Sequence, residues 1–159
     1  MSRTIPLSKW VRCPGTYFAI VDDEDYEWLS QWSWHCNHGY AVRIKQVNGK
    51  RTLIRMHRSI LKAGIGMIVD HKNGNKLDNR RKNLRFCTHA ENMRNSKMPS
   101  RNRTGLKGVS FHKHIKKWIA SIKFNGERTN LGYFTTPEEA HKAYCEKAKE
   151  LHGEFARFE

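Results

Sequence analysis

A basic segment without apolar periodicity divides this chain into two parts. Residues 96 to 107 read SKMPSRNRTGLK and include Pro99, Gly105 and several cations. A segment with no apolar side chains at helix or strand spacing has no face to bury, which is typical of a linker. Each flanking part is short, so each core must be modest. We therefore expect two small units, a domain over residues 1–96 and a domain over 108–159, joined by a linker over 97–107.

The composition favours folded units inside the cell. Apolar residues make up 38% of the chain, which includes five tryptophans, and this is too apolar for a disordered chain. No run of about 18 apolar residues occurs, and the N-terminus lacks the apolar core of a signal peptide. We expect a cytoplasmic protein with no membrane association.

The positive charge is concentrated in the middle of the chain. Residues 43–107 hold 18 Lys and Arg against three Asp and Glu, whereas residues 1–42 hold three against five and residues 108–159 hold nine against seven. The net charge of +15 is therefore the excess of the middle segment. A block of this size and sign is the electrostatic signature of a polyanion partner, most simply nucleic acid.

The cysteines do not indicate a metal or redox site. None of the four forms a C-x-x-C pair, so we interpret them as reduced thiols. The cluster His35-Cys36-Asn37-His38 has no second pair of ligands at the spacing of a zinc site.

The first part of the chain predicts a strand, a short helix and a hairpin. Residues 17–21 are an apolar strand, and an acidic helix start at 22–25 leads into a helical segment that reaches Trp32. Strands over 39–44 and 52–57 are joined by a turn at Asn48-Gly49. We expect this hairpin to lie along DNA phosphates through its cations, Arg43, Lys45, Arg51 and Arg55.

A polar loop follows the apolar residues 60–69. It reads DHKNGNKLDNRRKN over residues 70–83 and is followed by a short strand over 84–87. A capping box at Thr88 and Glu91 then predicts a helix from about His89 to Asn95.

The C-terminal part predicts three strands and one helix. The strands lie near residues 108–111, 117–124 and 128–133, with a turn at Asn125-Gly126, and Thr136-Pro137 starts the helix with a capping box that Glu139 completes. A stripe of alanines, Tyr144 and Leu151 packs the helix on the sheet. The polar face of the sheet is then free for the major groove of DNA.

The residues of the polar loop suit phosphodiester hydrolysis. A minimal site needs one divalent cation and one general base. Asp70 is a hard oxygen ligand for Mg²⁺ or Mn²⁺, and an asparagine carbonyl adds a ligand without charge. His71 titrates near neutrality, as a base requires. Adjacent residues point to different sides, so one can hold metal while the other faces the attacking water.

The pattern resembles HNH endonucleases of the phage homing type, whose site is a ββα-metal finger. The resemblance covers residues 15–96, with the finger at about 56–96, and rests on the segments Met56-His57-Arg58, Val69-Asp70-His71, Asn73-Gly74-Asn75, Leu77-Asp78-Asn79-Arg80-Arg81, Asn83-Leu84-Arg85 and Glu91-Asn92. It implies that His71 is the general base and that Asp70 and Asn92 hold one metal ion. Asn83 would tie the loop's backbone together, and Arg85 would clamp or support the scissile phosphate.

The C-terminal part is similar to AP2 DNA-binding domains over residues 105–158. The segments that carry this likeness are Gly108-Val109, Lys117 to Ile122, Leu131 to Phe134 and Glu138 to Tyr144. Ser110, Phe111 and Asn130 depart from the plant members, so their sequence preference does not transfer. The expected fold class is thus α+β, a ββα-metal nuclease domain followed by an AP2-like three-stranded antiparallel sheet packed on one helix.

Together these features predict a metal-dependent endonuclease for double-stranded DNA, acting as a monomer or homodimer at the nucleoid of a bacterial or phage-infected cell. A non-catalytic DNA-binding regulator is the alternative, and an RNA-directed protein is disfavoured because paired stacking aromatics are missing. His57 is interpreted as structural. The further DNA contacts expected are Arg80, Arg81, Lys82, Arg101, Arg103, Lys117, Ser121, Lys123, Arg128 and Asn130.

Overall fold

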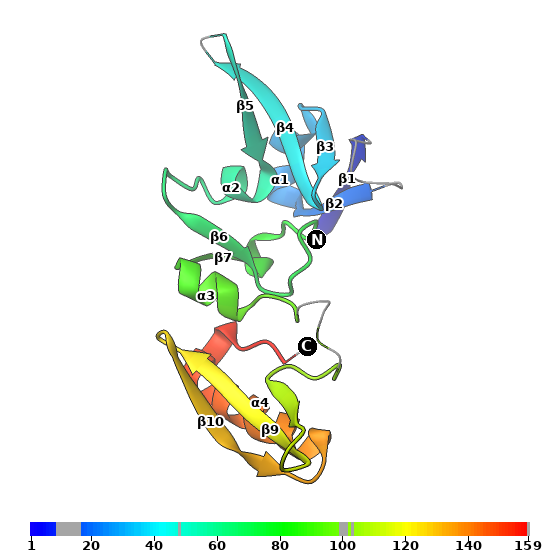
Figure 1. The fold of residues 1–159 in the computed structure, drawn as a ribbon. Coiled ribbons are helices and arrows are strands. Elements are labelled where there is room, and N and C mark those ends of the chain that lie inside the picture. The colour runs from blue at the N-terminus through cyan, green and yellow to red at the C-terminus, as the bar shows by residue number, and fades with distance from the viewer. Residues whose placement is uncertain (9–16, 48, 99–101, 103, 159) are drawn as a thin grey trace. The chain divides into compact units, whose positions relative to one another are not determined.

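The computed structural model describes residues 1–8, 17–47, 49–98, 102 and 104–158 (Figure 1). The chain is α+β, with several sheets and few helices. It forms two compact units, Met1–Thr88 and His89–Glu159. This division places residues 89–96 with the C-terminal part, although the sequence grouped them with the N-terminal one. Arg101 and Arg103 lie outside the described residues.

The N-terminal unit contains a five-stranded sheet in the order β2-β1-β3-β4-β5. β1 pairs antiparallel with β2 and parallel with β3, and the other neighbours are antiparallel. Its core is formed by buried side chains of the sheet and of two short helices, among them Val21, Leu29, Trp34 and Met56. The strands are β1 (Ser2–Ser8), β2 (Tyr17–Asp22), β3 (Trp34–Asn37), β4 (Tyr40–Val47) and β5 (Lys50–Arg55).

The first helix, α1 (Asp23–Ser30), starts with three acidic residues, which favour its positive N-terminal end. The prediction that the helical segment reaches Trp32 is wrong. The backbone N–H of Trp32 and the indole of Trp34 both donate to the carbonyl of Leu29, at 3.2 and 2.8 Å. These two bonds occupy a helix-end carbonyl and turn the chain back into the sheet.

The predicted hairpin is confirmed as β4 and β5, which Figure 1 shows as a long ribbon. Val47 pairs with Lys50, so two residues connect the strands; one of them, Asn48, lies outside the described residues. The second strand ends at Arg55, two residues earlier than predicted, because Met56 and His57 begin the helix α2 (Met56–Ile60). Met56 and Ile60 are buried one helical turn apart, and this i, i+4 spacing favours the helix.

The polar loop lies between two short antiparallel strands. β6 (Ile68–His71) pairs with β7 (Leu84–Cys87), and a 3₁₀ turn (Arg81–Asn83) precedes β7. Asp70 and His71 are the last two residues of β6. The loop is fastened to β2, where the N–H of Ile20 donates to the carbonyl of Leu77 at 2.8 Å and the N–H of Asn79 donates to the carbonyl of Ile20 at 2.7 Å.

The C-terminal unit confirms the predicted three strands and helix. Its antiparallel sheet has the order β10-β9-β8, with β8 (Val109–His112), β9 (Lys117–Phe124) and β10 (Glu127–Phe134). The helix α4 (Pro137–His152) packs on it through buried Ala140, Tyr144 and Ala148, and a short 3₁₀ turn (Gly153–Phe155) follows. The predicted capping box of α4 is present, and a Cβ at Gly108 would lie 2.0 Å from the ring of Tyr144.

The short helix α3 (His89–Arg94) is anchored within the C-terminal unit. Lys107 donates through Nζ to the carbonyls of Arg94 and Ser96, at 3.1 and 2.9 Å, which satisfies groups at the helix end. The guanidinium of Arg94 lies over the ring of Phe124 at 4.8 Å and donates to Asn125 Oδ1 at 3.3 Å. These contacts explain why the helix groups with the C-terminal part.

Candidate active site

The strands β6 and β7 bring together a buried ion pair. Asp70 and Arg85 are cross-strand partners, and both Nε and Nη2 of Arg85 donate to Oδ2 of Asp70, at 3.0 and 2.9 Å. The two residues are 7% and 9% exposed. Two hydrogen bonds from one guanidinium hold Oδ2 of this buried carboxylate in place. Arg85 therefore contacts Asp70 directly, a contact that the sequence alone did not predict.

His71 lies beside this pair in a group of rings. Its ring centroid is 4.9 Å from that of His57 and 6.1 Å from that of Tyr40. Burial lowers the pKa of the His71 imidazole, while a hydrogen-bonding contact with Asn79 and the negative charge of Asp70 act in the opposite direction. The balance favours the neutral imidazole, which is the form that accepts a proton.

His57 supports the ring of His71 from α2. Burial, together with the neighbouring His71, Arg55 and Arg58, lowers the pKa of His57 to about 3. The ring is therefore neutral in the folded chain near pH 7. Nδ1 of His57 is buried and has no hydrogen-bond partner in the part of the chain that the structure describes. The structural role of His57 stays a prediction.

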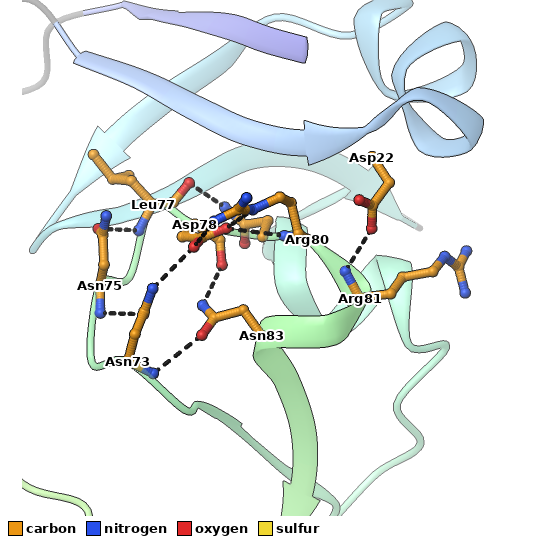
Figure 2. A network of polar contacts seen from close by, with 9 residues as sticks. Asp22, Asn73, Asn75, Leu77, Asp78, Arg80, Arg81 and Asn83 are labelled. Carbon is orange, nitrogen blue, oxygen red and sulfur yellow. Dashed lines mark hydrogen bonds and ion pairs between the residues drawn. The ribbon is translucent and has the colours of Figure 1, made fainter. Parts of the chain in front are cut away.

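The loop after His71 is held by its own asparagines (Figure 2). Asn83 Oδ1 accepts from the N–H of Asn73 at 3.0 Å, and Asn83 Nδ2 donates to the carbonyl of Asp78 at 2.7 Å. These two bonds close the loop from both ends. Nδ2 of Asn73 in turn donates to Asp78 Oδ2 at 2.9 Å. The amide of Asn83 thus binds loop backbone, in agreement with what the sequence led us to expect of it.

Two arginines expected at phosphates are engaged inside the N-terminal unit. Arg80 makes two bonds of 2.7 Å with Asp78 and lowers the pKa of that carboxyl group. Arg81 binds Asp25 through Nε and Nη2, at 2.8 and 2.7 Å, and its N–H donates to Asp22 at 2.7 Å (Figure 2). Asp25 is only 1% exposed, so Arg81 compensates a buried charge. Lys82, the next cation, is exposed.

The cations of the β4–β5 hairpin lie on both faces. The pairing of the two strands places Arg51 and Arg55 on one face and Arg43 and Lys45 on the other. Arg43 covers the ring of Trp32, with 4.1 Å between its guanidinium carbon and the ring centroid. Lys45, Arg51 and Arg55 are exposed.

The C-terminal residues expected at DNA share the sheet face opposite α4. Arg128 pairs with Lys123 and Asn130 with Ser121, and Nε of Arg128 donates to Oγ of Ser121 at 3.1 Å. Lys117 lies on the same face of β9, because it alternates with the buried residues of that strand.

Asn92, the other expected metal ligand, lies on α3 in the C-terminal unit and is half-buried, whereas Asp70, His71, Asn83 and Arg85 lie in the N-terminal unit. Among the described residues, no three His, Cys, Asp or Glu side chains are grouped as a metal site. A metal site made by Asp70 and Asn92 would not be such a group, because it contains one aspartate and one asparagine. No helix in the described ranges is long and apolar enough to span a membrane.

Comparison with known proteins identifies the family. A family model described as HNH endonuclease matches residues 62–94. An HNH endonuclease, L560, of Acanthamoeba polyphaga mimivirus, described as uncharacterized, is 33% identical over 149 residues, which are 91% of this chain and 75% of that protein. Protein 3.8 of Escherichia phage T7 is 37% identical over 93 residues, 58% of this chain and 76% of that protein. No solved structure gives a significant match.

The matches define a class of enzyme, the endonucleases. Within it, the chain belongs to the HNH endonuclease family. Its substrate is therefore DNA, and enzymes of this family generally use a divalent metal ion. The alternative of a non-catalytic DNA-binding protein is set aside.

Proposed function

We propose that this chain is a homing-type endonuclease that hydrolyses double-stranded DNA, with His71 as the general base, and that its C-terminal unit is an AP2-like domain that selects the site. The observation that carries this proposal is the buried, neutral imidazole of His71 next to Asp70 at the end of β6. A base on a strand end, fixed by the rings of His57 and Tyr40, can face a water in one direction only. Such fixed geometry is what in-line attack on phosphorus requires.

Asp70 and Asn92 are the proposed ligands of one Mg²⁺ or Mn²⁺ ion. Their oxygen atoms suit hard cations, and neither supplies the nitrogen or sulfur that favours zinc. A divalent cation held there would stabilise the charge that develops on the phosphate and on the leaving oxygen. Arg85 holds Oδ2 of the Asp70 carboxylate in place through its two bonds. We therefore assign Arg85 a positioning role that acts through Asp70.

DNA binding is assigned to two surfaces. The first is the N-terminal unit, where phosphates are contacted by Lys82 and by exposed cations on both faces of the β4–β5 hairpin, Arg51 and Arg55 on one face and Lys45 on the other. The sheet face with Lys117, Ser121, Lys123, Arg128 and Asn130 lies in the major groove, as its flat polar surface permits. Arg80 and Arg81 stabilise the fold and are not assigned to DNA binding, because their guanidinium groups neutralise Asp78 and Asp25.

The central test compares the wild type with His71→Ala on supercoiled plasmid in Mg²⁺ or Mn²⁺. We expect nicked or linear DNA with 5′-phosphate and 3′-hydroxyl ends, and no product in EDTA. The variant should cut about 10²- to 10⁴-fold more slowly, as for loss of a positioned base, with unchanged DNA affinity. The matched control is His38→Asn, since His38 is exposed in the same unit and its positive φ of 50° suits asparagine. Cutting by His71→Ala at the wild-type rate would refute the assignment.

Selection of the site by the C-terminal sheet is tested separately. Arg128→Gln and Lys123→Gln should weaken DNA binding and broaden the sites found when cleavage ends are sequenced on a genomic library. The slope of log affinity against log salt should become less negative by about 0.9 for each phosphate that the variant no longer neutralises. A cleavage map unchanged in the double variant would remove the selecting role and leave the nuclease assignment intact.

A further inference from the structure

The connection between α2 and β6 presents two apolar side chains to solvent, Ile65 and, less fully, Met67. Ile65 is 105% exposed, as much as in an extended chain, and lies in the sequence Gly64-Ile65-Gly66. Figure 1 shows this connection extending outward from the N-terminal unit. Three residues further on, β6 begins, and it carries Asp70 and His71. Ile65 precedes His71 by six residues, and its side chain, exposed on the connection into β6, is available for contact with the substrate.

The turn that carries Ile65 is braced. The N–H of Met67 donates to the carbonyl of Gly64 at 3.3 Å, and Gly66 has a φ of 80°, as the third position of a type II turn requires. From below, Arg58 donates to the carbonyls of Ala63, Gly64 and Met67. The tip is therefore held by a guanidinium group with three acceptors and is not a loose loop.

The shape and charge of the turn fit the minor groove of duplex DNA. Because glycines flank Ile65, the tip is as thin as a backbone and one side chain, and the groove is only about 6 Å wide. The carbonyls that would repel phosphates are bound to Arg58, whose charge also lies under the tip. Lys62 in the same connection is exposed. The turn lies within residues 43–107, which carry the positive excess of the chain.

We propose that Ile65 is an apolar wedge that enters the minor groove and unstacks a base step beside the bond that is cut. Side chains of this type open base steps and bend DNA in other proteins. The wedge would widen the groove and present the phosphate to His71. This inference rests on the proposed nuclease function, since it concerns the same substrate.

The test uses duplexes around a mapped cleavage site, each with 2-aminopurine at a different position, bound to protein in EDTA. The wild type should raise the fluorescence at one step, which reports local unstacking. Ile65→Ala should lose most of that rise and cut about tenfold more slowly in Mg²⁺, because truncation removes the apolar contact with the bases. Ile65→Met should retain both properties, since methionine is also apolar and reaches as far.

Two controls separate the wedge from general damage. Ile115→Ala removes an exposed isoleucine of the C-terminal unit and should behave like the wild type. Arg58→Met keeps Ile65 but releases the three carbonyls, and should give an intermediate fluorescence rise. A wild type that cuts DNA without unstacking any step would overturn the wedge alone. Loss of self-association in Ile65→Ala, with unstacking intact, would identify Ile65 as a protein contact, and a chain that never cuts DNA would overturn both proposals.

Discussion

The substitution Asn83→Ala tests whether one amide organises the polar loop. Asn83 is 6% exposed and makes one bond to the N–H of Asn73 and one to the carbonyl of Asp78. A hydrogen bond contributes about 1 kcal/mol net, and a buried acceptor left without its donor costs about 1–3 kcal/mol more. We therefore expect the free energy of unfolding of the N-terminal unit to fall by about 2–4 kcal/mol. This is a large part of the 5–15 kcal/mol that is usual for a domain.

Urea unfolding followed by tryptophan fluorescence is the suitable assay, because four of the five tryptophans lie between residues 10 and 34. The midpoint should fall with the slope unchanged, as for a loss of stability without a change in the surface exposed. Asn75→Ala is the control on the same loop: Asn75 is exposed and its side chain accepts one bond, from the N–H of Leu77. It should cost less than about 1 kcal/mol. A cost for Asn83→Ala no larger than that of the control would refute the reasoning.

Three further predictions concern other contacts. The pKa of His57 is lowered from 6.5 to about 3, so the folded chain binds fewer protons than the unfolded one between these values. The free energy of unfolding should then fall on acidification through this window by up to about 1.4 kcal/mol per pH unit. In urea unfolding at several pH values, the stability of His57→Phe should depend less steeply on pH than that of the wild type. Equal pH dependence in the two proteins would contradict the assignment of this effect to His57. Arg81→Met leaves Asp25 buried without its main partner and should lower the free energy of unfolding, measured in urea, by about 3–5 kcal/mol. Weaker DNA binding at unchanged stability would show that the ion pair is dispensable for the fold. Gly108→Ala should lower the melting temperature of the C-terminal unit by several degrees more than Gly126→Ala. Both positions have a positive φ, but only a Cβ at residue 108 would lie against a tyrosine ring. Equal shifts of the melting temperature in calorimetry would exclude that clash as the cause.

The elements that the sequence predicted well are those with a local signal. The β4–β5 hairpin and the turn at Asn125-Gly126 follow from dipeptides that accept positive φ. The capping box and the alanine stripe of α4 likewise depend on residues close together in the chain. Such signals are complete within a few residues, so no knowledge of the fold was needed to read them.

The errors occur where distant residues decide the structure. Met56 and His57 read as strand because they continue an alternating pattern, but burial of Met56 and Ile60 against the core favours a helical turn. The end of α1 was placed too late, since the bonds that stop it come from Trp32 and Trp34, beyond the helix. Neither contact leaves a mark in a short window of sequence.

The sequence suggests the residues of the proposed site, and their roles stay predictions, but it does not give the ion pairs around them. Asp70, His71 and Asn83 were singled out by spacing and resemblance. The sequence does not predict the pairing of Arg81 with Asp25, although the acidic run at 22–25, which indicates a helix start, also offers a partner for a basic loop. Charges of opposite sign in separate segments were the available signal. Which of them meet depends on the tertiary fold.

The bonds from Arg81 to Asp22 and Asp25 also bear on when this enzyme becomes active during synthesis. They join residues 59 and 56 positions apart, so the proposed catalytic loop is anchored to the start of the chain as well as by its own asparagines. Contacts of such long range form late in folding, since a large loop must close first. A nascent chain that has emerged only in part would then hold His71 and Asp70 in an unorganised segment. The DNA of the cell would thus meet an active nuclease only after the whole N-terminal unit has left the ribosome.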